Sequence, residues 1–201
     1  MVSAGSADRY LPDTVQQAVK ILIVGAFGVG KTTFVGAISE IEPLVTEAAM
    51  TEASLGVDDL TGLSGKTTTT VALDFGRITL DRTLLLYLFG TPGQDRFSFL
   101  WDDLVDGALG AVILLDTRRI EDCFPALDYF EDRDTPLLIA VNNFDRARRF
   151  DLQEVREALG TGPEVPIVAC DARSRESVKQ VLVELIEQVV ARRLAAATAS
   201  R

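Results

Sequence analysis

The sequence contains no histidine and only two cysteines, Cys123 and Cys170. Without an imidazole there is no Ser-His triad, no histidine acid–base catalysis and no histidine-bound zinc ion. Two cysteines without a C-x-x-C spacing predict neither a disulfide framework nor a metal cluster. These absences exclude the histidine-dependent hydrolases and the usual zinc proteins.

Long apolar runs and a basic surplus are also missing. No stretch approaches the roughly 18 apolar residues that span a bilayer, and residues 1–13 lack the basic start and apolar core of a secretory signal. Acidic residues outnumber basic ones 30 to 20, which gives a formal net charge of −10. We therefore expect no nucleic-acid binding and no direct membrane insertion. The expected location is cytoplasmic, with any recruitment to a membrane made through partners.

What is present is one globular domain: 201 residues, 47% of them apolar. Residues 1–18 are expected to form a flexible arm, 19–196 the domain and 197–201 a frayed tail. Apolar runs predict strands at residues 20–24, 70–75, 83–89, 109–115, 136–141 and 165–169. Helical patterns follow at 32–39, 95–105, 121–132 and 151–159, and residues 43–69 show no element.

The last helix carries an apolar stripe at helical spacing, made of Val178, Val181, Leu182, Leu185, Val189 and Val190. Alternating strands and helices predict a three-layer α/β domain with a mostly parallel, six-stranded sheet. The short link at Asp81-Arg82 predicts a hairpin, which adds one antiparallel edge strand. Ligands of such sheets bind at the carboxyl ends of the strands.

Residues 25–32 read G-A-F-G-V-G-K-T, the phosphate-loop pattern G-x-x-x-x-G-K-[ST], between a predicted strand and a predicted helix. The glycines let backbone N–H groups surround phosphates at a helix N-terminus. Lys31 is predicted to reach the β- and γ-phosphates, and the Thr32 hydroxyl to hold Mg²⁺. The alternative is a glycine turn with an incidental lysine. The predicted phosphate-binding residues are Gly25, Phe27, Gly28, Val29, Gly30, Lys31, Thr32 and Thr33.

Two further segments follow strands and point to a purine base. Asn142-Asn143-Phe144-Asp145 resembles the guanine motif Asn-Lys-x-Asp, in which the carboxylate accepts N1–H and the exocyclic amino group of guanine. The alternative is a turn and helix cap. Residues 170–173 stand where GTPases carry Ser-Ala-Lys, whose backbone contacts the guanine oxygen. The residues of this second segment are Cys170, Asp171, Ala172 and Arg173.

Two segments resemble γ-phosphate sensors. Residues 89–94, F-G-T-P-G-Q, resemble Asp-x-x-Gly-Gln; the Gly93 N–H would bind the γ-phosphate and Gln94 would orient the attacking water, with Lys31 the other catalytic candidate. Residues 70–75 resemble a switch segment in which Thr70 is the second hydroxyl on Mg²⁺, although residues 67–69 are also threonines. The alternatives are a glycine-proline turn and a threonine-rich strand entry.

In their order and in their sequences, these motifs resemble those of the Ras-like small GTPases over about residues 20–194. The segments look most like the bacterial conservon-encoded branch related to the gliding-motility GTPase MglA. The resemblance implies binding of GTP and GDP with Mg²⁺. It also implies a roadblock/LC7-type regulatory partner and a sensor resembling a histidine kinase.

The chain departs from that family at three positions. Gly90 stands where most GTPases have an aspartate that holds Mg²⁺ through water, which predicts weaker metal binding. Asn143 replaces the lysine whose stem covers the base. Phe27 replaces a glycine that faces the γ-phosphate, and residues 42–70 contain no arginine to act as an internal finger. We expect a slow, partner-regulated GTPase, with a pseudo-GTPase interaction module or a small-molecule kinase as alternatives.

Overall fold

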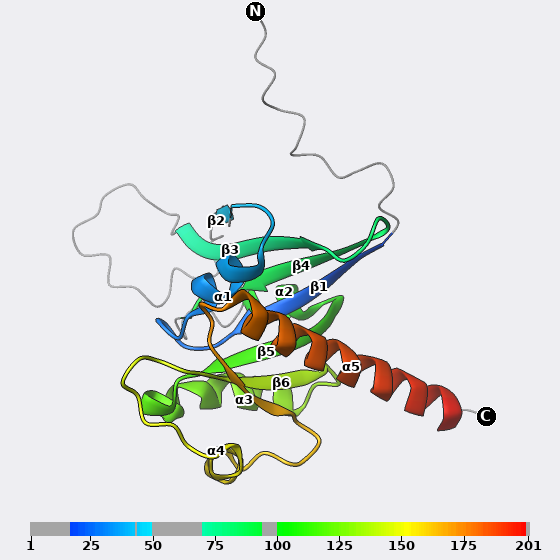
Figure 1. Cartoon of the computed structure of the whole chain (residues 1–201). Helices are drawn as coiled ribbons and strands as arrows, with labels where there is room; N and C mark the ends of the chain where they lie inside the picture. Colours follow the sequence, from blue (N-terminus) through cyan, green and yellow to red (C-terminus); the bar gives the residue numbers. More distant parts are fainter. Residues whose placement is uncertain (1–16, 43, 50–69, 94–99, 200–201) are drawn as a thin grey trace, which may run out of the picture.

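A computed structural model describes residues 17–42, 44–49, 70–93 and 100–199 (Figure 1). Its seven-stranded sheet has the order β2-β3-β4-β1-β5-β6-β7. Five strands run parallel: β4 (Leu84–Gly90), β1 (Gln17–Val24), β5 (Ala108–Leu115), β6 (Leu137–Asn142) and β7 (Ile167–Cys170). The mostly parallel α/β fold expected of a P-loop protein is confirmed.

The hairpin side of the sheet differs from the prediction. β3 (Thr70–Thr79) is antiparallel to β4, as expected, but it is not the edge strand. β2 (Leu44–Ala49) pairs antiparallel with β3 and lies outside it, in a segment for which no element was predicted. Its six residues are too few to show a clear period, and pairing with a strand that begins more than 20 residues later defines it.

Two layers of helices sandwich the sheet (Figure 1). On one face, α1 (Lys31–Ile38) and α5 (Arg175–Ala199) share a core with Ile21 and Ile23 of β1. On the other, α2 (Leu100–Val105), α3 (Phe124–Glu131) and α4 (Leu152–Leu159) share a core with Leu22 and Val24. Because successive strand residues point to opposite faces, one continuous apolar run supplies both cores.

Most helix predictions hold, with shifts at their ends; residues 95–99 of the second predicted helix lie outside the described residues. The 3₁₀ helix η4 (Thr117–Cys123) precedes α3, which begins at Phe124 because Pro125 suits a first turn that needs no N–H donor. The α5 stripe is buried except Val190, which is 49% exposed. That helix continues to Ala199.

The topology places five loop regions at one edge of the sheet. They follow the carboxyl ends of β1, β4, β5, β6 and β7, which are parallel neighbours. All but one of the predicted site segments that the structure describes lie in these loops. The exception is the segment of β3, which reaches the same edge because that strand runs in the opposite direction.

Candidate nucleotide-binding site

The loop between β1 and α1 has the backbone of a phosphate cradle. Gly25, Gly28 and Gly30 all have positive φ, and Gly30, at φ 106°, is the N-terminal cap of α1. A side chain on Gly30 would also lie 2.7 Å from the Asn142 amide nitrogen, so the position has room only for glycine. Val29 is buried and anchors the loop, whereas Thr33 is exposed at the start of the helix.

Lys31 lies inside this loop. Its Nζ donates to the backbone oxygens of Gly25 (2.6 Å) and Ala26 (2.8 Å), and the residue is only 8% exposed. Burial lowers the pKa of this ammonium group to about 8, and the nearby Asp74 carboxylate opposes part of that shift. A desolvated cation enclosed by backbone dipoles is suited to receive phosphate oxygens.

The lowered pKa predicts a pH-dependent affinity for nucleotides. Phosphates favour the charged ammonium, so the pKa of Lys31 is higher in the complex than in the free protein. Affinity should therefore be constant below pH 8 and fall by up to about tenfold per pH unit above it, because binding then requires proton uptake. Calorimetric titration of GDP between about pH 7 and 9 tests this. Guanosine, which has no phosphate, is the control and should show no such fall.

Thr32 has a carboxylate partner that was not among the predicted site residues. Its Oγ1 donates to Asp74 Oδ2 at 2.7 Å. Asp74 on β3 pairs directly with Gly90 on β4, and a Cβ added to Gly90 would lie 2.8 Å from the Asp74 Cβ and 2.9 Å from its Oδ2. Asp74 thus occupies the space that a side chain at Gly90 would fill. The carboxylate missing from β4 is present at the same place on the neighbouring strand.

The pairing of Asp74 with Gly90 depends on the exact length of the hairpin turn. A two-residue turn at Asp81-Arg82 would pair residue 74 with residue 89, whereas the observed turn is centred on Arg82 and pairs residue 74 with residue 90. Asp81 fixes that turn by accepting the N–H groups of Thr83 (2.6 Å) and Leu84 (3.0 Å). A short, defined turn sets the register of both strands.

The loops after β6 and β7 are tied to the phosphate loop through Asn142. This residue is 7% exposed, its Nδ2 donates to Val29 O (2.9 Å), and its Oδ1 accepts the N–H of Ala172 (3.0 Å). The Asn143 N–H donates to Cys170 O (2.7 Å). In the segment whose backbone was predicted to contact the guanine oxygen, the Ala172 amide is therefore engaged by Asn142. Cys170 is buried, which raises its pKa to about 11 and keeps the thiol protonated.

Asp145 and Arg173 meet across these two loops. The Arg173 Nη1 donates to Asp145 Oδ2 (2.7 Å) and its Nη2 to Oδ1 (3.1 Å). Arg173 also binds Asp171 through Nε and Nη2, both at 2.9 Å. The Arg173 guanidinium holds the pKa of Asp145 below its usual range, so this carboxylate is an acceptor at neutral pH.

The remaining predicted residues approach the loop from two sides. A Cβ on Gly93 would lie 2.6 Å from Lys31 Nζ and 2.7 Å from the Phe27 nitrogen, so the Gly93 backbone lies against the cradle. Phe27 is 72% exposed, and its backbone carbonyl accepts a hydrogen bond from Arg119 Nη2 of η4 at 3.1 Å. Arg119 was not predicted, because nothing in its sequence context marks that contact.

For two predicted residues, Gln94 and Thr70, the structure does not describe the side chain. Gln94 lies outside the described residues, as do residues 67–69. Thr70 begins β3 opposite Ala49.

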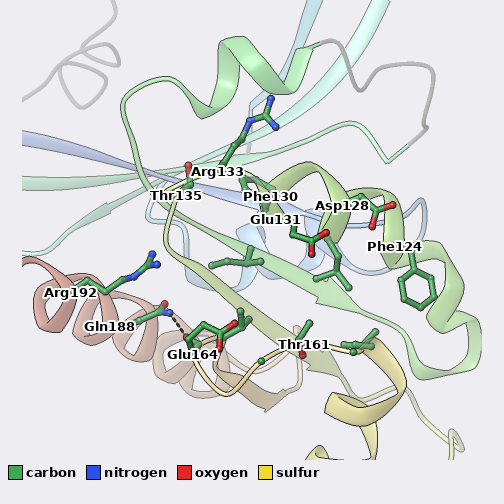
Figure 2. Close-up of a pocket in the computed structure, with 16 residues that line it drawn as sticks. Phe124, Asp128, Phe130, Glu131, Arg133, Thr135, Thr161, Glu164, Gln188 and Arg192 are labelled. Atoms are coloured by element: carbon green, nitrogen blue, oxygen red, sulfur yellow. Dashed lines mark hydrogen bonds between the residues drawn. The ribbon is translucent and has the colours of Figure 1, made fainter.

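A separate cavity of about 260 Å³ lies at the opposite edge of the sheet, between α3, the loop before β7 and α5 (Figure 2). Gln188 donates to Glu164 O at 3.1 Å beside it. Within the described part of the chain, Thr161 Oγ1 and Gln188 Oε1 are buried there without a hydrogen-bond partner. The cavity begins near Leu137, at the start of β6, and so is distinct from the site at the carboxyl ends.

The fold, the cradle around Lys31 and the polar loops beside it define a P-loop nucleotide-binding domain. The chain belongs to the family whose model is described as "Conserved hypothetical ATP binding protein", which matches residues 23–192. In the residues that the structure describes, no helix is long and apolar enough to cross a membrane.

Individual relatives give a finer comparison. The chain is 23% identical to the Ras-related protein SEC4 of Saccharomyces cerevisiae, over 94% of this chain and 83% of SEC4. It is 26% identical to the human Ras-related protein Rab-7b, over 87% of this chain and 83% of that protein. These relatives support the Ras-like part of the resemblance.

Solved structures share the fold. The G domain of the T. maritima FeoB iron transporter superposes with a TM-score of 0.56 at 20% identity, covering 87% of this chain and 98% of that domain. The cytosolic domain of the same transporter in GDP form I gives 0.61 at 19% identity, covering 87% and 64%.

Proposed function

We propose that this protein is a guanine-nucleotide switch that binds GTP and GDP with Mg²⁺ and hydrolyses GTP slowly. The observation that carries the proposal is the convergence of three groups at one edge of the sheet: the Lys31 cradle, the Thr32–Asp74 pair, and Asp145 beside the Asn142 anchor. A domain that offers different surfaces in its GTP and GDP states can control the binding of a partner.

The comparisons name nucleotides with two different bases: the family description names ATP, whereas the FeoB domain was solved in a GDP form. Asp145 favours guanine. Its carboxylate accepts hydrogen bonds only, and guanine presents two donors, N1–H and the amino group. Adenine presents an unprotonated N1 at that edge and would place an acceptor against an acceptor. Each hydrogen bond to a charged group is worth roughly 1.5–3 kcal/mol, so the discrimination is large.

Asp145→Asn should shift the preference from guanine toward xanthine. Xanthine carries an oxygen where guanine has its amino group, and the new amide can donate to that oxygen. Competition between GDP and xanthosine diphosphate measures the shift, which should reach on the order of 100-fold in relative affinity. ADP is the matched control ligand, because it does not use this contact. An unchanged GDP-to-xanthosine-diphosphate ratio would remove Asp145 from the base site.

The oxygen atoms beside the cradle fit Mg²⁺, which prefers hard oxygen ligands. Thr32 Oγ1 and Asp74 Oδ2 lie 2.7 Å apart at the N-terminus of α1. We assign Thr32 as a ligand, Asp74 as the carboxylate that the metal or its water contacts, and Thr70 as the second hydroxyl. Bound Mg²⁺ neutralises charge on the phosphates. Because Asp74 supplies the carboxylate that is absent at position 90, a glycine at that position is compatible with metal binding.

Slow turnover is the expected consequence of Phe27. An arginine that stabilises the transferring phosphoryl group is worth about 10³–10⁵ in rate, and the Phe27 ring, at an exposed position of the loop, would crowd its approach. We propose that Gln94 orients water and that Lys31 stabilises the phosphates. A roadblock/LC7-type protein would then regulate the switch in a conservon-type pathway with a histidine-kinase-like sensor. The MglA-related resemblance motivates these partners and a cytoplasmic setting.

The test is a binding series with GTP, GDP, ATP and ADP, each with and without Mg²⁺, followed by single-turnover hydrolysis of GTP. We expect guanine nucleotides to bind more tightly, Mg²⁺ to strengthen binding, and GTP to be cleaved slowly. Preference for ATP would overturn the assignment of the base. Tight GTP binding without turnover would instead identify a pseudo-GTPase, and phosphate transfer to an added acceptor would identify a kinase.

A further inference from the structure

Asp145, the side chain proposed to bind guanine, already accepts hydrogen bonds from Arg173, whose donors resemble those of the base. Asp145 accepts two hydrogen bonds from Arg173, at 2.7 and 3.1 Å, one on each carboxylate oxygen. This is the bidentate, fork-to-fork arrangement of a guanidinium and a carboxylate. Both lone-pair edges that face Arg173 are thereby occupied.

The guanidinium has the same donor pattern as the base. Guanine offers N1–H and an exocyclic N–H, carried on two nitrogens that share one carbon, and guanidinium offers two N–H groups on the same N–C–N unit. A carboxylate receives either through two parallel hydrogen bonds. Arg173 and a guanine therefore compete for one face of Asp145.

The fold brings the two residues together and provides a second place for the arginine. Asn142 and Cys170 are register partners at the ends of β6 and β7, so the loops that follow them are adjacent. Arg173 also binds Asp171 through Nε to Oδ1 and Nη2 to Oδ2, each 2.9 Å. Asp171 in turn is fixed to α5 by its backbone N–H, which donates to Ser177 Oγ at 2.9 Å.

We propose that Arg173 is a built-in guanine mimic: it closes the base site by occupying Asp145, and guanine nucleotides bind by displacing it while Asp171 retains it. The inference rests on the proposed guanine specificity of this site. Arg173 thereby reduces guanine affinity in a way that does not act on nucleotides with other bases.

The exposure of the pair limits its strength. The side chains of Arg173 and Asp145 are 54% and 78% exposed, so solvent and salt screen their attraction. Exposed ion pairs of this kind contribute enough to change an equilibrium about two- to fivefold. Arg173 is thus a weak competitor, which a guanine that makes both hydrogen bonds to Asp145 can displace.

Arg173→Ala should therefore raise GDP affinity about two- to fivefold and leave ADP affinity unchanged. Arg173→Gln, which keeps much of the stem, should behave in the same way. In an Asp145→Ala background, Arg173→Ala should have no effect, because no carboxylate remains to compete for. The gain should shrink between about 0.05 and 0.5 M KCl, since salt weakens the pair in the unmodified protein. Arg192→Ala, on the exposed side of α5, is the matched control.

Isothermal titration with GDP and ADP gives all of these affinities. Unchanged or weaker GDP binding by both Arg173 variants would overturn the proposal, because the arginine would then support the base. A gain that persists without Asp145, or that appears equally with ADP, would also overturn it as a general charge effect. If neither the unmodified protein nor Arg173→Ala binds guanine nucleotides, the proposed function itself fails. If the unmodified protein binds GDP but removal of Arg173 brings no gain, only this inference fails.

Discussion

Lys31→Ala should weaken binding of GTP and GDP on the order of 100-fold or more. The ammonium group is enclosed by its own loop, with donors aimed at Gly25 O and Ala26 O. Nucleotide binding lets those donors reach phosphate oxygens, and alanine removes both the charge and the hydrogen bonds. The fold should persist, because burial already lowers the pKa of this group and removing a desolvated cation does not destabilise the core.

Fluorescence titration with a ribose-labelled GDP measures the loss, and circular dichroism shows whether the variant is folded. Lys179→Ala is the matched control, since this lysine lies exposed on α5 and pairs only loosely with Glu176 at 3.9 Å. GDP binding by folded Lys31→Ala at the strength of the unmodified protein would mean that the loop is a structural turn.

Local patterns in the sequence were sufficient for the phosphate loop and the helices beside it. The glycines, Lys31 and Thr32 are contiguous, and a strand and a helix flank them, so no distant contact is needed to interpret them. The parallel strands can also be predicted from local sequence, because each is an apolar run buried on both faces. β2 was missed because its pairing with β3, and not its own composition, makes it a strand.

The pairs that tune the site could not be found from single motifs. Gly90 alone indicates a lost carboxylate, and only its register with Asp74 shows that the carboxylate has moved to the neighbouring strand. Asp145 alone indicates a residue that binds the base, and only the adjacency of two loops shows that Arg173 donates hydrogen bonds to it. In both cases the role of a residue depends on a partner elsewhere in the chain: Asp74 for Gly90 and Arg173 for Asp145.

Asp74→Ala should reduce the affinity for Mg²⁺ in the nucleotide complex about 10- to 100-fold, as expected when a carboxylate that contacts a metal or orients its ligand is lost. Thr32 would lose the acceptor that lies 2.7 Å from its hydroxyl. Asp74→Asn keeps an oxygen for that hydroxyl but removes the charge, so its loss should be intermediate. Gly90→Ala should act in the same direction, because the added Cβ would lie 2.8 Å from the Asp74 Cβ and displace the side chain.

The decisive experiment moves the carboxylate back across the hairpin. Asp74→Gly combined with Gly90→Asp should recover much of the Mg²⁺ affinity, because the two positions are direct cross-strand partners and their side chains compete for one space. Gly90→Asp alone should not improve binding, since Asp74 already fills that space. Release of labelled GDP as a function of Mg²⁺ concentration measures each variant. Asp81→Ala, which removes the carboxylate at the turn of the same hairpin, controls for simple damage to the strands. Normal Mg²⁺ dependence in Asp74→Ala, or no recovery in the exchanged pair, would show that Asp74 only braces Thr32 and that Gly90 marks a true loss of the metal carboxylate.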